Sequence, residues 1–376
     1  MTIRIVPYTA ELEPAVRAFN ARIAAACLDP NLYSTRFHEH HAPAWLPPRD
    51  DCDLFQEQFL ALDDDSIVRG GYVLKHQKFL IHGEPVRLAH YRLPISEGII
   101  DSRFTTVAVR MYYDALGKQS RLFGLGGGGY HTPVNRFLIA AGYQAVTVPF
   151  YFRVVSPVRF LRNAAVLRSS QLRAAALDCL AWTGLGWLGI QTLQCLRHKH
   201  RPAASVACER VEEFGAWADD VWNQCKQHYS LIAVRDRQIV NVLYPRCDPR
   251  FVRLKITRAG AAIGWAVLLE TRMSGHKQFG NMHVGTLVDC LAAPDDARDV
   301  TACARDVLES DGVDLMVSNQ ASEAWCRALR ECGFLQGPSN LPFFAAPPLA
   351  ALLQPFEENA KRFHLNRGDG DGPINL

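Results

Sequence analysis

The sequence predicts an α+β protein built from two similar units. Its 376 residues suffice for two domains of ordinary size, and 48% hydrophobic with 21% charged residues is typical of a globular chain. Alternating apolar residues interrupted by glycines indicate antiparallel strands, and segments of helical pattern follow them. Two short motifs of the first half recur in the second half. These observations together predict mixed, mostly antiparallel sheets with flanking helices, used twice.

Composition limits the class of protein. The net charge of +3 does not call for a nucleic-acid partner, and none is expected. The cysteines number eleven and lack CxxC spacing, which fits buried thiols in a reducing compartment better than disulfides or a zinc cluster. The first residues, MTIRIVPYTAELEPAV, lack the apolar run of a secretory signal, so a cytoplasmic location is expected.

The first half predicts its elements in a clear order. The pattern indicates a strand at 3–6, a helix at 12–26, an antiparallel meander from 66 to 95, a helix at 105–116 and a strand at 121–125. A second helix follows, because Thr132 suits an N-cap and Pro133 suits the first helical position. Gly142 then favours the left-handed stop of that helix, and the next strand is expected at 145–155.

Two motifs repeat. Residues 136–143, RFLIAAGY, match 327–334, RALRECGF, 191 residues later, and a Pro-Phe pair follows each copy. Upstream, GYVL from Gly71 matches GWAVL from Gly264 at a spacing of 193. Such self-similarity indicates one supersecondary unit used twice.

These segments resemble the GNAT acyltransferase fold. A strand, an L-x(3)-G-[YF] helix and a closing hairpin are similar to the C-terminal half of that fold, and the meander followed by a helix is similar to its middle. The resemblance implies GNAT-like domains at 1–155 and 206–348, a basic and apolar helical linker at 156–205 and a tail at 349–376. It extends to tandem proteins of bacterial exopolysaccharide clusters and, more distantly, to Fem-type aminoacyltransferases. The second domain is expected to be degenerate.

The stretch LFGLGGGGYHTPVN at 122–135 satisfies G-x-G-x-x-G literally. A dinucleotide site also needs an acidic residue about 20 positions on, and there is no Asp or Glu between Asp114 and Asp178. The P-loop ending is absent too. In the GNAT resemblance this run ends the fifth strand, where acyl-CoA passes, so the backbone must come close to a ligand. A tight corner without a ligand is the alternative. The predicted cofactor residues here are Gly126, Gly127, Gly128, Gly129 and Asn135.

The stretch of this chain that corresponds to the family's pyrophosphate-binding loop departs from the family's pattern. The corresponding stretch 101–108, DSRFTTVA, has no glycine, although Ser102, Arg103, Thr105 and Thr106 offer donors. The second-half stretch 294–299 is acidic and would repel a pyrophosphate. One acyl-CoA or acetyl-CoA site is therefore expected, in the first half. Eight Lys or Arg residues without an acid between 115 and 177 favour an anionic ligand or surface, or a merely solvated basic face.

The resemblance implies direct acyl transfer with a general base and an acid. Glu97, after an irregular fourth strand, is the first candidate base, and Tyr130 or His131 is a candidate acid or substrate contact. The family's usual tyrosine is replaced by Leu138 and Leu329. Each candidate also has an ordinary structural explanation, as an exposed carboxylate or as a residue packed beside a helix cap.

Two acidic positions complete the candidate catalytic set. Asp289 follows the apolar run of the second half's fourth strand. Asp369 lies in the tail RGDGDG, which either frays or folds back into a cleft, where it would hold a sugar hydroxyl or act as a base. His38-Glu-His-His41 invites a metal reading, but no distant partner is implied and no metal is expected.

The uncharged segment 179–196, with basic flanks, allows three interpretations: a buried inter-domain helix, a peripheral membrane contact through 168–201, or a spanning helix. The function expected from the resemblance is transfer of an acyl group from acyl-CoA to an amine or hydroxyl of a sugar or polysaccharide precursor, in the cytoplasm or at the inner membrane face. The alternatives are a non-catalytic scaffold and a Fem-type transferase that uses aminoacyl-tRNA.

Overall fold

The computed structural model describes residues 2–26, 36–41, 46–48, 52–163, 202, 204–276 and 279–370. The chain forms two compact units. The first unit comprises Met1–Thr147 with Asn340–Glu357, and the second comprises Val148–Ser339 with Glu358–Leu376. Each unit contains a mixed sheet and helices, so the predicted α+β class is confirmed.

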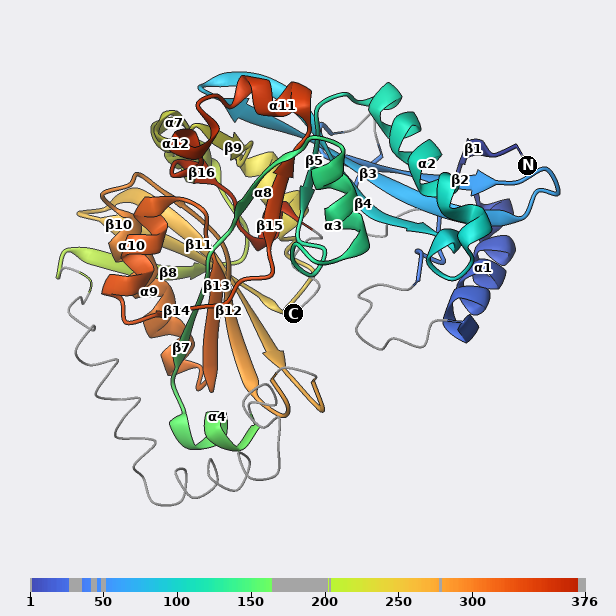
Figure 1. The fold of residues 1–376 in the computed structure, drawn as a ribbon. Helices are drawn as coiled ribbons and strands as arrows, with labels where there is room; N and C mark the ends of the chain where they lie inside the picture. Colours follow the sequence, from blue (N-terminus) through green and yellow to red (C-terminus); the bar gives the residue numbers. More distant parts are fainter. Residues whose placement is uncertain are drawn as a thin grey trace. The chain divides into compact units, whose positions relative to one another are not determined.

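The first unit is built on a sheet of order β1-β2-β3-β4-β5-β15-β6 (Figure 1). Its neighbours are antiparallel except for β4 and β5, which are parallel. Its elements are β1 (Arg4–Pro7), α1 (Glu13–Ala26), β2 (Phe55–Leu62), β3 (Val68–Ile81), β4 (Glu84–Ser96), α2 (Thr105–Lys118), β5 (Leu122–Leu125), α3 (Pro133–Ala140), β6 (Gln144–Thr147), β15 (Pro342–Ala345) and α11 (Pro347–Leu352).

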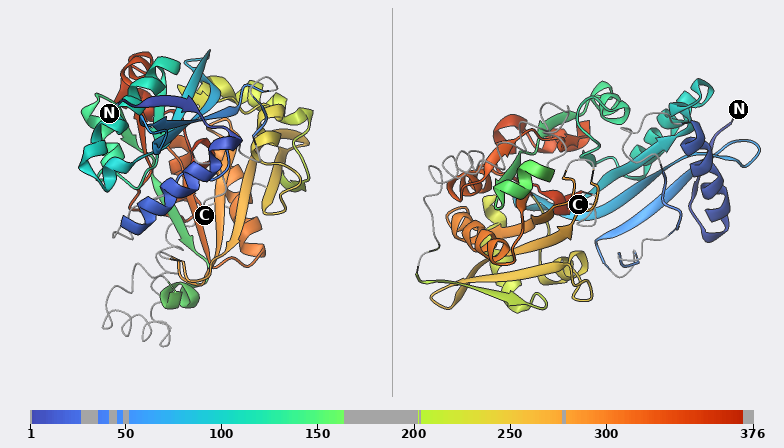
Figure 2. Two further views of the ribbon diagram at one scale, coloured as in Figure 1. Left: turned by 90° about the vertical axis from the view of Figure 1, so that its right-hand side faces the viewer. Right: turned by 90° about the horizontal axis from the view of Figure 1, so that it is seen from below.

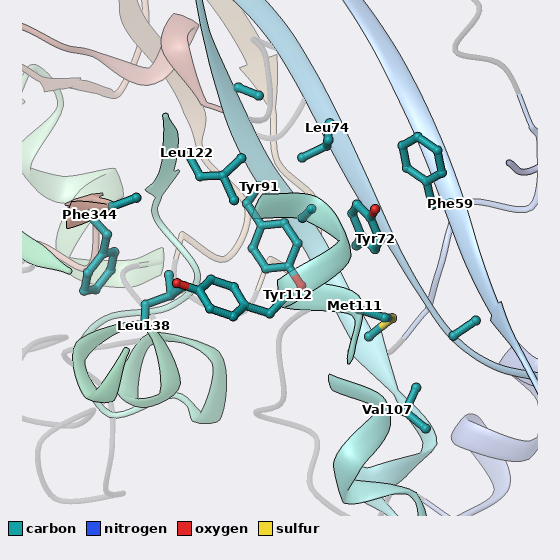
Figure 3. Packing of buried hydrophobic residues seen from close by; sticks show 14 of the residues in the cluster. Phe59, Tyr72, Leu74, Tyr91, Val107, Met111, Tyr112, Leu122, Leu138 and Phe344 are labelled. Carbon is teal, nitrogen blue, oxygen red and sulfur yellow. The ribbon is translucent and has the colours of Figure 1, made fainter. Parts of the chain in front are cut away.

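Helices cover both faces of this sheet. On one face α2 and α3 pack on the strands, where Tyr72, Tyr91 and Tyr112 lie close together with Met111 and Leu138 (Figure 3). On the other face α1 packs on β2 and β3 through its apolar residues. The helical spacing of buried residues in α1 and α2 thus explains the predicted helices.

The second unit has a sheet of order β14-β7-β13-β12-β11-β10-β8, in which only β12 and β13 are parallel. Its elements are β7 (Phe150–Val154), α4 (Pro157–Asn163), β8 (Val206–Val211), α7 (Ala216–Cys225), β9 (Leu231–Ala233), α8 (Arg237–Leu243), β10 (Phe251–Arg258), β11 (Ala261–Arg272), β12 (His283–Ala292), α9 (Ala297–Ser310), β13 (Leu315–Asn319), α10 (Glu323–Glu331), β14 (Leu335–Gly337) and β16 (Phe363–His364). The short helix α12 (Phe356–Ala360) precedes β16 in the chain.

The closing strands are exchanged between the two sequence halves. The single strand predicted at 145–155 is in fact two strands, interrupted at Val148 and Pro149, where proline offers no N–H for a ladder. The first of these, β6, stays in the first sheet, and β7 runs beside β13 in the second, as Figures 1 and 2 show. Conversely, β15 lies between β5 and β6. The compact units therefore do not follow the predicted boundaries 1–155 and 206–348, which assumed chain order.

The repeated motif occupies the same place in both units. Gly142 follows α3 and Gly333 follows α10, and both have φ of 84°. Leu138 and Leu329 are buried at matching positions. The sequence repeat therefore marks one helix and its left-handed C-terminal stop.

Both sheets carry a β-bulge in the strand that precedes the parallel crossover. In β4, Gly71 pairs with Ile95 and Val73 with Arg92, so two residues, Leu93 and Pro94, face one residue of β3. In β12 the extra residue is Val288. The irregular fourth strand expected from Pro94 is observed.

Most of the predicted linker, with the apolar segment 179–196 and the basic residues to 201, lies outside the described residues. Within the described part of the chain, no helix is both long and apolar enough to cross a membrane. The tail is ordered through residue 370, so the fraying interpretation is wrong up to that point, and Asp371 lies outside the described residues.

Candidate functional site

The strands β4 and β5 separate soon after they meet. Their parallel pairing comprises Ala89 with Leu122 and His90 with Phe123. Beyond these pairs β4 continues to its bulge while β5 runs into the glycine loop, which we define as residues 126–131. An opening between two parallel strands at their carboxyl ends is a position where ligands meet free backbone groups.

The glycine loop has an unusual backbone. Gly126, Gly127, Gly128 and Gly129 have φ of 93°, 78°, 86° and 97°, values that residues with a side chain rarely adopt. The Asn135 side chain fixes this conformation, because its Nδ2 donates to the Gly126 oxygen at 2.9 Å and to the Gly129 oxygen at 2.7 Å. The predicted loop residues are therefore brought together by α3 itself.

Most backbone N–H groups of the loop have no acceptor among the described residues. The N–H of Gly126 is bound by the Pro342 oxygen at 2.9 Å, but the N–H groups from 127 to 131 find no acceptor among the described residues. The loop leads into the N-terminus of α3, which starts at Pro133. Consecutive backbone donors at a helix N-terminus favour negatively charged or polarised oxygens.

Two predicted catalytic residues lie on this loop. The Tyr130 hydroxyl lies 3.0 Å from Thr147 Oγ1, and its ring packs edge-on against Phe344. His131 is exposed. Tyr130 is thus anchored by packing while His131 faces solvent.

Glu97 is held by two cations. Arg22 Nε lies 2.8 Å from its Oε1, and Arg69 NH1 lies 2.7 Å from its Oε2. Burial opposes ionisation, but the two guanidinium groups outweigh it and lower the pKa of Glu97. A carboxylate with both oxygens engaged and a lowered pKa is a weak base, so this arrangement suits a structural ion pair.

The predicted pyrophosphate donors are only partly available. Arg103 is engaged by Asp101, with its Nε 2.9 Å from Oδ2, and the Thr105 hydroxyl donates to the Ser102 oxygen at 2.7 Å. Ser102 and Thr106 are exposed side chains of the same turn. Asp101 brings negative charge to this turn, which weakens it as a phosphate site.

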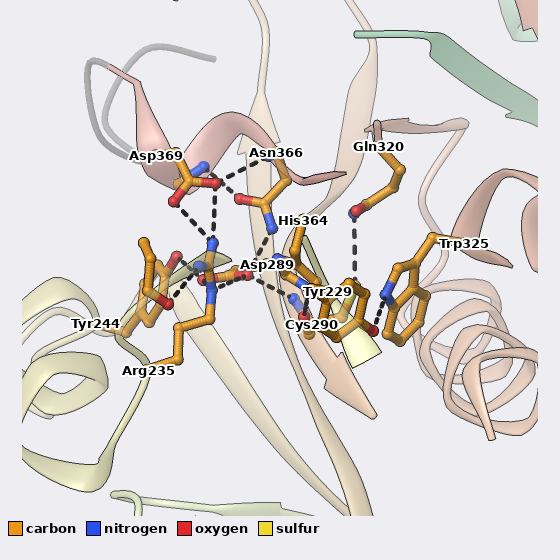
Figure 4. Close-up of polar contacts among 12 residues, drawn as sticks. Tyr229, Arg235, Tyr244, Asp289, Cys290, Gln320, Trp325, His364, Asn366 and Asp369 are labelled. Carbon is orange, nitrogen blue, oxygen red and sulfur yellow. Dashed lines mark hydrogen bonds and ion pairs between the residues drawn. The ribbon is translucent and has the colours of Figure 1, made fainter. Parts of the chain in front are cut away.

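In the second unit, Asp289 and Asp369 meet across one buried arginine (Figure 4). Arg235 Nε lies 3.0 Å from Asp289 Oδ1, and its NH2 lies 2.9 Å from both oxygens of Asp369. The Tyr244 hydroxyl donates to Asp289 Oδ2 at 2.8 Å. All of these side chains are almost completely buried. Asp289 lies beside the bulge at Val288 rather than at the end of its strand.

The tail brings Asp369 to this place. Asn366 Nδ2 donates to Asp289 Oδ1 at 2.6 Å on β12, and Arg367 Nε donates to Asn319 Oδ1 at 2.8 Å on β13. His364 Nε2 lies 2.8 Å from the Cys290 oxygen and, since a carbonyl only accepts, Nε2 carries the hydrogen. Residues 363–369, the tail segment, therefore contact both strands at the edge where β12 and β13 part.

Burial governs the electrostatics of this cluster. It raises the pKa of Asp369, against the charge of Arg235 and with the help of Asp289. Burial and the Arg235 charge together hold the pKa of His364 far below its usual value, so the ring is neutral. Burial also lowers the pKa of Arg367 to about 10. Arg235, Asp289, Asp369 and Tyr244 form a closed set of paired groups, an arrangement that fixes structure, whereas Nδ1 of His364 has no hydrogen-bond partner among the described residues.

Sequence reasoning missed the partners of the two aspartates. Arg235, Tyr244 and Asn366 carry no motif, and the segments that hold them lie far from Asp289 in the chain. The one available signal was Arg235 directly after the apolar run LIAV, since a buried charge at the end of a strand needs a partner.

No metal site is evident in the described ranges, where no group of three or more His, Cys, Asp or Glu side chains is placed to hold an ion. His41 of the HEHH stretch pairs with Glu13, its Nδ1 lying 3.0 Å from Oε1.

Comparison with known proteins gives similar structures without similar sequences. No protein-family model matches the chain, and no curated protein matches it in sequence. A probable N-acyltransferase of unknown function from Enterococcus faecalis superposes with a TM-score of 0.52 at 12% identity, over 94% of this chain and 75% of that one. Saccharomyces cerevisiae N-myristoyltransferase with bound myristoyl-CoA gives 0.52 at 9%, over 92% and 78%. A GCN5-related glucosamine N-acetyltransferase region of a fungal β-N-acetylglucosaminidase gives 0.51 at 11%, over 91% and 38%.

These likenesses show the fold. The chain has a GNAT-type fold, which confirms the fold expected from the sequence motifs. At such identities nothing further is shown, so activity and site residues have to be argued from the chain's own geometry.

Proposed function

We propose that the chain is an acyltransferase that moves an acyl group from acyl-CoA to an amine or hydroxyl of a sugar or polysaccharide precursor. The observation that carries this proposal is the glycine loop, whose N–H groups from 127 to 131 find no acceptor among the described residues, next to the place where β4 and β5 part. Backbone donors of this kind stabilise an oxygen that gains negative charge, as a thioester oxygen does when a nucleophile attacks it.

Three features of the neighbours support the substrates. The Enterococcus protein is named a probable N-acyltransferase, the yeast enzyme binds myristoyl-CoA, and the fungal region acts on glucosamine by its name. The acyl-CoA donor of the proposal agrees with the yeast neighbour, and the amino-sugar acceptor agrees with the fungal one. Tyr130 and His131, which lie on the loop, are the proposed acid or acceptor contacts, since Glu97 is engaged by two arginines.

The second unit is proposed to support the first without catalysing transfer. The tail segment occupies the place where β12 and β13 part, which corresponds to the opening between β4 and β5. Asp289 and Asp369 are bound to Arg235 there. In this scheme the two aspartates are structural, and one acyl-CoA binds per chain. The proposal includes a peripheral membrane contact through 168–201, near lipid-linked precursors at the inner membrane face; this segment lies outside the described residues.

The test is thermal melting with acetyl-CoA, longer acyl-CoAs and free CoA. A ligand that prefers the folded state raises the melting temperature in a saturable way. Gly129→Ala should weaken this rise, because an alanine disfavours φ of 97° in the loop. Gly260→Ala is the matched control: its φ is 83°, and an added Cβ would meet no atom within 4 Å at either position. A folded wild-type protein that no acyl-CoA stabilises would contradict the proposal.

A further inference from the structure

The two parallel strand pairs part at different distances from their bulges. In the second unit the β12–β13 ladder runs from Val284 to Leu287 and stops directly before the bulged Val288. In the first unit the ladder stops at His90, three residues before Leu93. At about 3.3 Å per residue, the first opening is longer by about 7 Å, or two residues.

The side chain of His90 accounts for the early end of the first ladder. Its Nε2 accepts the hydrogen bond of the Leu125 N–H at 3.1 Å, a donor that would otherwise need an acceptor on β4. The ring also stacks on Phe123, with centroids 4.8 Å apart and planes 10° apart. Both His90 and Leu125 are buried, so water does not replace this bond.

In the described part of the second unit, the position that corresponds to His90 carries no such side chain. The pairs Ala89 with Leu122 and Val284 with Leu315 correspond, because each starts its ladder, so the counterpart of His90 is Gly285. A Cβ at Gly285 would lie 2.7 Å from Leu308 Cδ2 and 3.0 Å from Val313 Cγ1, so a side chain there would force these packed residues to shift. Without an imidazole between the strands, backbone pairing continues for two more residues.

We propose that His90 is a positioning residue that ends the ladder between β4 and β5 early and so makes room between them for acyl-CoA. This inference rests on the proposed function for its ligand, but the strand geometry it describes can be tested without one. The bond to Leu125 satisfies a buried N–H without a strand partner, and the stack on Phe123 fixes the ring that accepts it.

Three variants separate the acceptor from the ring. His90→Phe keeps a ring to stack on Phe123 and removes the acceptor, whereas His90→Gln restores an acceptor oxygen at similar reach. His76→Phe is the matched control, because His76 is another buried histidine of this sheet, stacked on Phe55 with centroids 4.5 Å apart. It lies on β3 and does not bridge β4 to β5.

The first measurement is amide hydrogen exchange at Leu125 in the protein without ligand. His90→Phe should speed exchange by about tenfold or more, since the Leu125 amide loses the imidazole nitrogen that accepts its hydrogen bond. His90→Gln should restore much of the protection, and His76→Phe should leave it unchanged. Unchanged protection in His90→Phe would overturn the proposal whether or not any acyl-CoA binds.

The second measurement is the acetyl-CoA concentration needed for half of the thermal shift, with KM and kcat where turnover is found. His90→Phe should raise this concentration, and KM, by about tenfold while kcat stays within about twofold, and His90→Gln should recover the affinity. Equal affinity in wild type and His90→Phe would overturn the positioning role and leave the proposed function intact. Absence of any shift in the wild type would overturn the proposed function, and with it the acyl-CoA part of this inference.

Discussion

In the first unit the strands β4 and β5 part beside the glycine loop, whose N–H groups from 127 to 131 have no acceptor in the described chain, whereas in the second unit the parting strands β12 and β13 are bridged by the chain's own tail segment. The backbone plan is the same on both sides, down to the bulge and the glycine at φ of 84° after the helix.

The difference shows that one fold can either leave the polar groups unpaired where its parallel strands part or pair them with other groups of the protein. The second unit meets them with side chains of the tail segment and with a buried charge cluster. The first unit leaves backbone donors without a protein acceptor. Such donors destabilise the fold unless water or a ligand accepts their hydrogen bonds.

Arg235→Met should have the largest effect. It leaves Asp289 and Asp369 buried without their cation, which costs about 3–5 kcal/mol of unfolding free energy. Urea unfolding followed by tryptophan fluorescence measures it. The control is Arg246→Gln, since the Arg246–Glu212 pair is solvent-exposed and its loss should cost at most about 1 kcal/mol. Equal losses in both variants would refute the closed cluster.

Glu97→Gln should cost about 2–3 kcal/mol at pH 7, because it weakens charged hydrogen bonds to Arg22 and Arg69. The pKa of Glu97 is lowered in the folded state, so its ionised form stabilises the fold above the unfolded value near pH 4.3 and this stability is lost as pH falls toward the folded value. The difference between wild type and variant should therefore shrink in acid. A difference independent of pH would contradict the ion pairs.

The contribution of Asp369 to stability should depend on pH in the opposite direction to that of Glu97. Its pKa is raised in the folded state, so the protonated form favours folding at low pH and the contribution is lost as pH rises through the raised value. Asp369→Asn, an uncharged replacement, should therefore be better tolerated at pH 7 than Arg235→Met, by about 1–2 kcal/mol. Urea unfolding of both variants at one pH decides this, and an equal or larger loss in Asp369→Asn would argue against it.

Asn135→Ala should cost about 1–2 kcal/mol and weaken acyl-CoA stabilisation, because the oxygens of Gly126 and Gly129 lose their donor. Asn241→Ala is the control in the second unit, where Asn241 makes two comparable bonds to the backbone of Phe214. It should lose similar stability without changing the acyl-CoA response. If both variants respond to acyl-CoA alike, the glycine loop is a tight turn that does not bind acyl-CoA.

Gly142→Ala and Gly333→Ala should have small effects on stability that are similar to each other. Both glycines have φ of 84°, and an alanine there costs about 1–2 kcal/mol. Melting temperatures of the two variants should drop by similar amounts. A clear inequality would show that the two helix ends, although alike in backbone, differ in how much their surroundings can adjust.

The sequence by itself determined the class of fold and its repetition. Local patterns reported the helices at 12–26 and 105–116, because they depend on residues a few positions apart. The Thr132-Pro133 start and the Gly142 stop were equally readable, since helix ends have strong local preferences. The glycine run was visible as a place of positive φ, and the structure bears this out at Gly126 through Gly129.

Only the tertiary structure decided which sheet each closing strand joins and what the acidic residues do. A strand such as β7 has the same alternation in either sheet, so no local signal places it beside β13. Asp289, Asp369 and Arg235 are brought together from segments far apart in the chain, and Glu97 meets Arg22 in the same way. Pairing of buried charges is a non-local property, because the cost of burial can be met by any partner that the fold supplies.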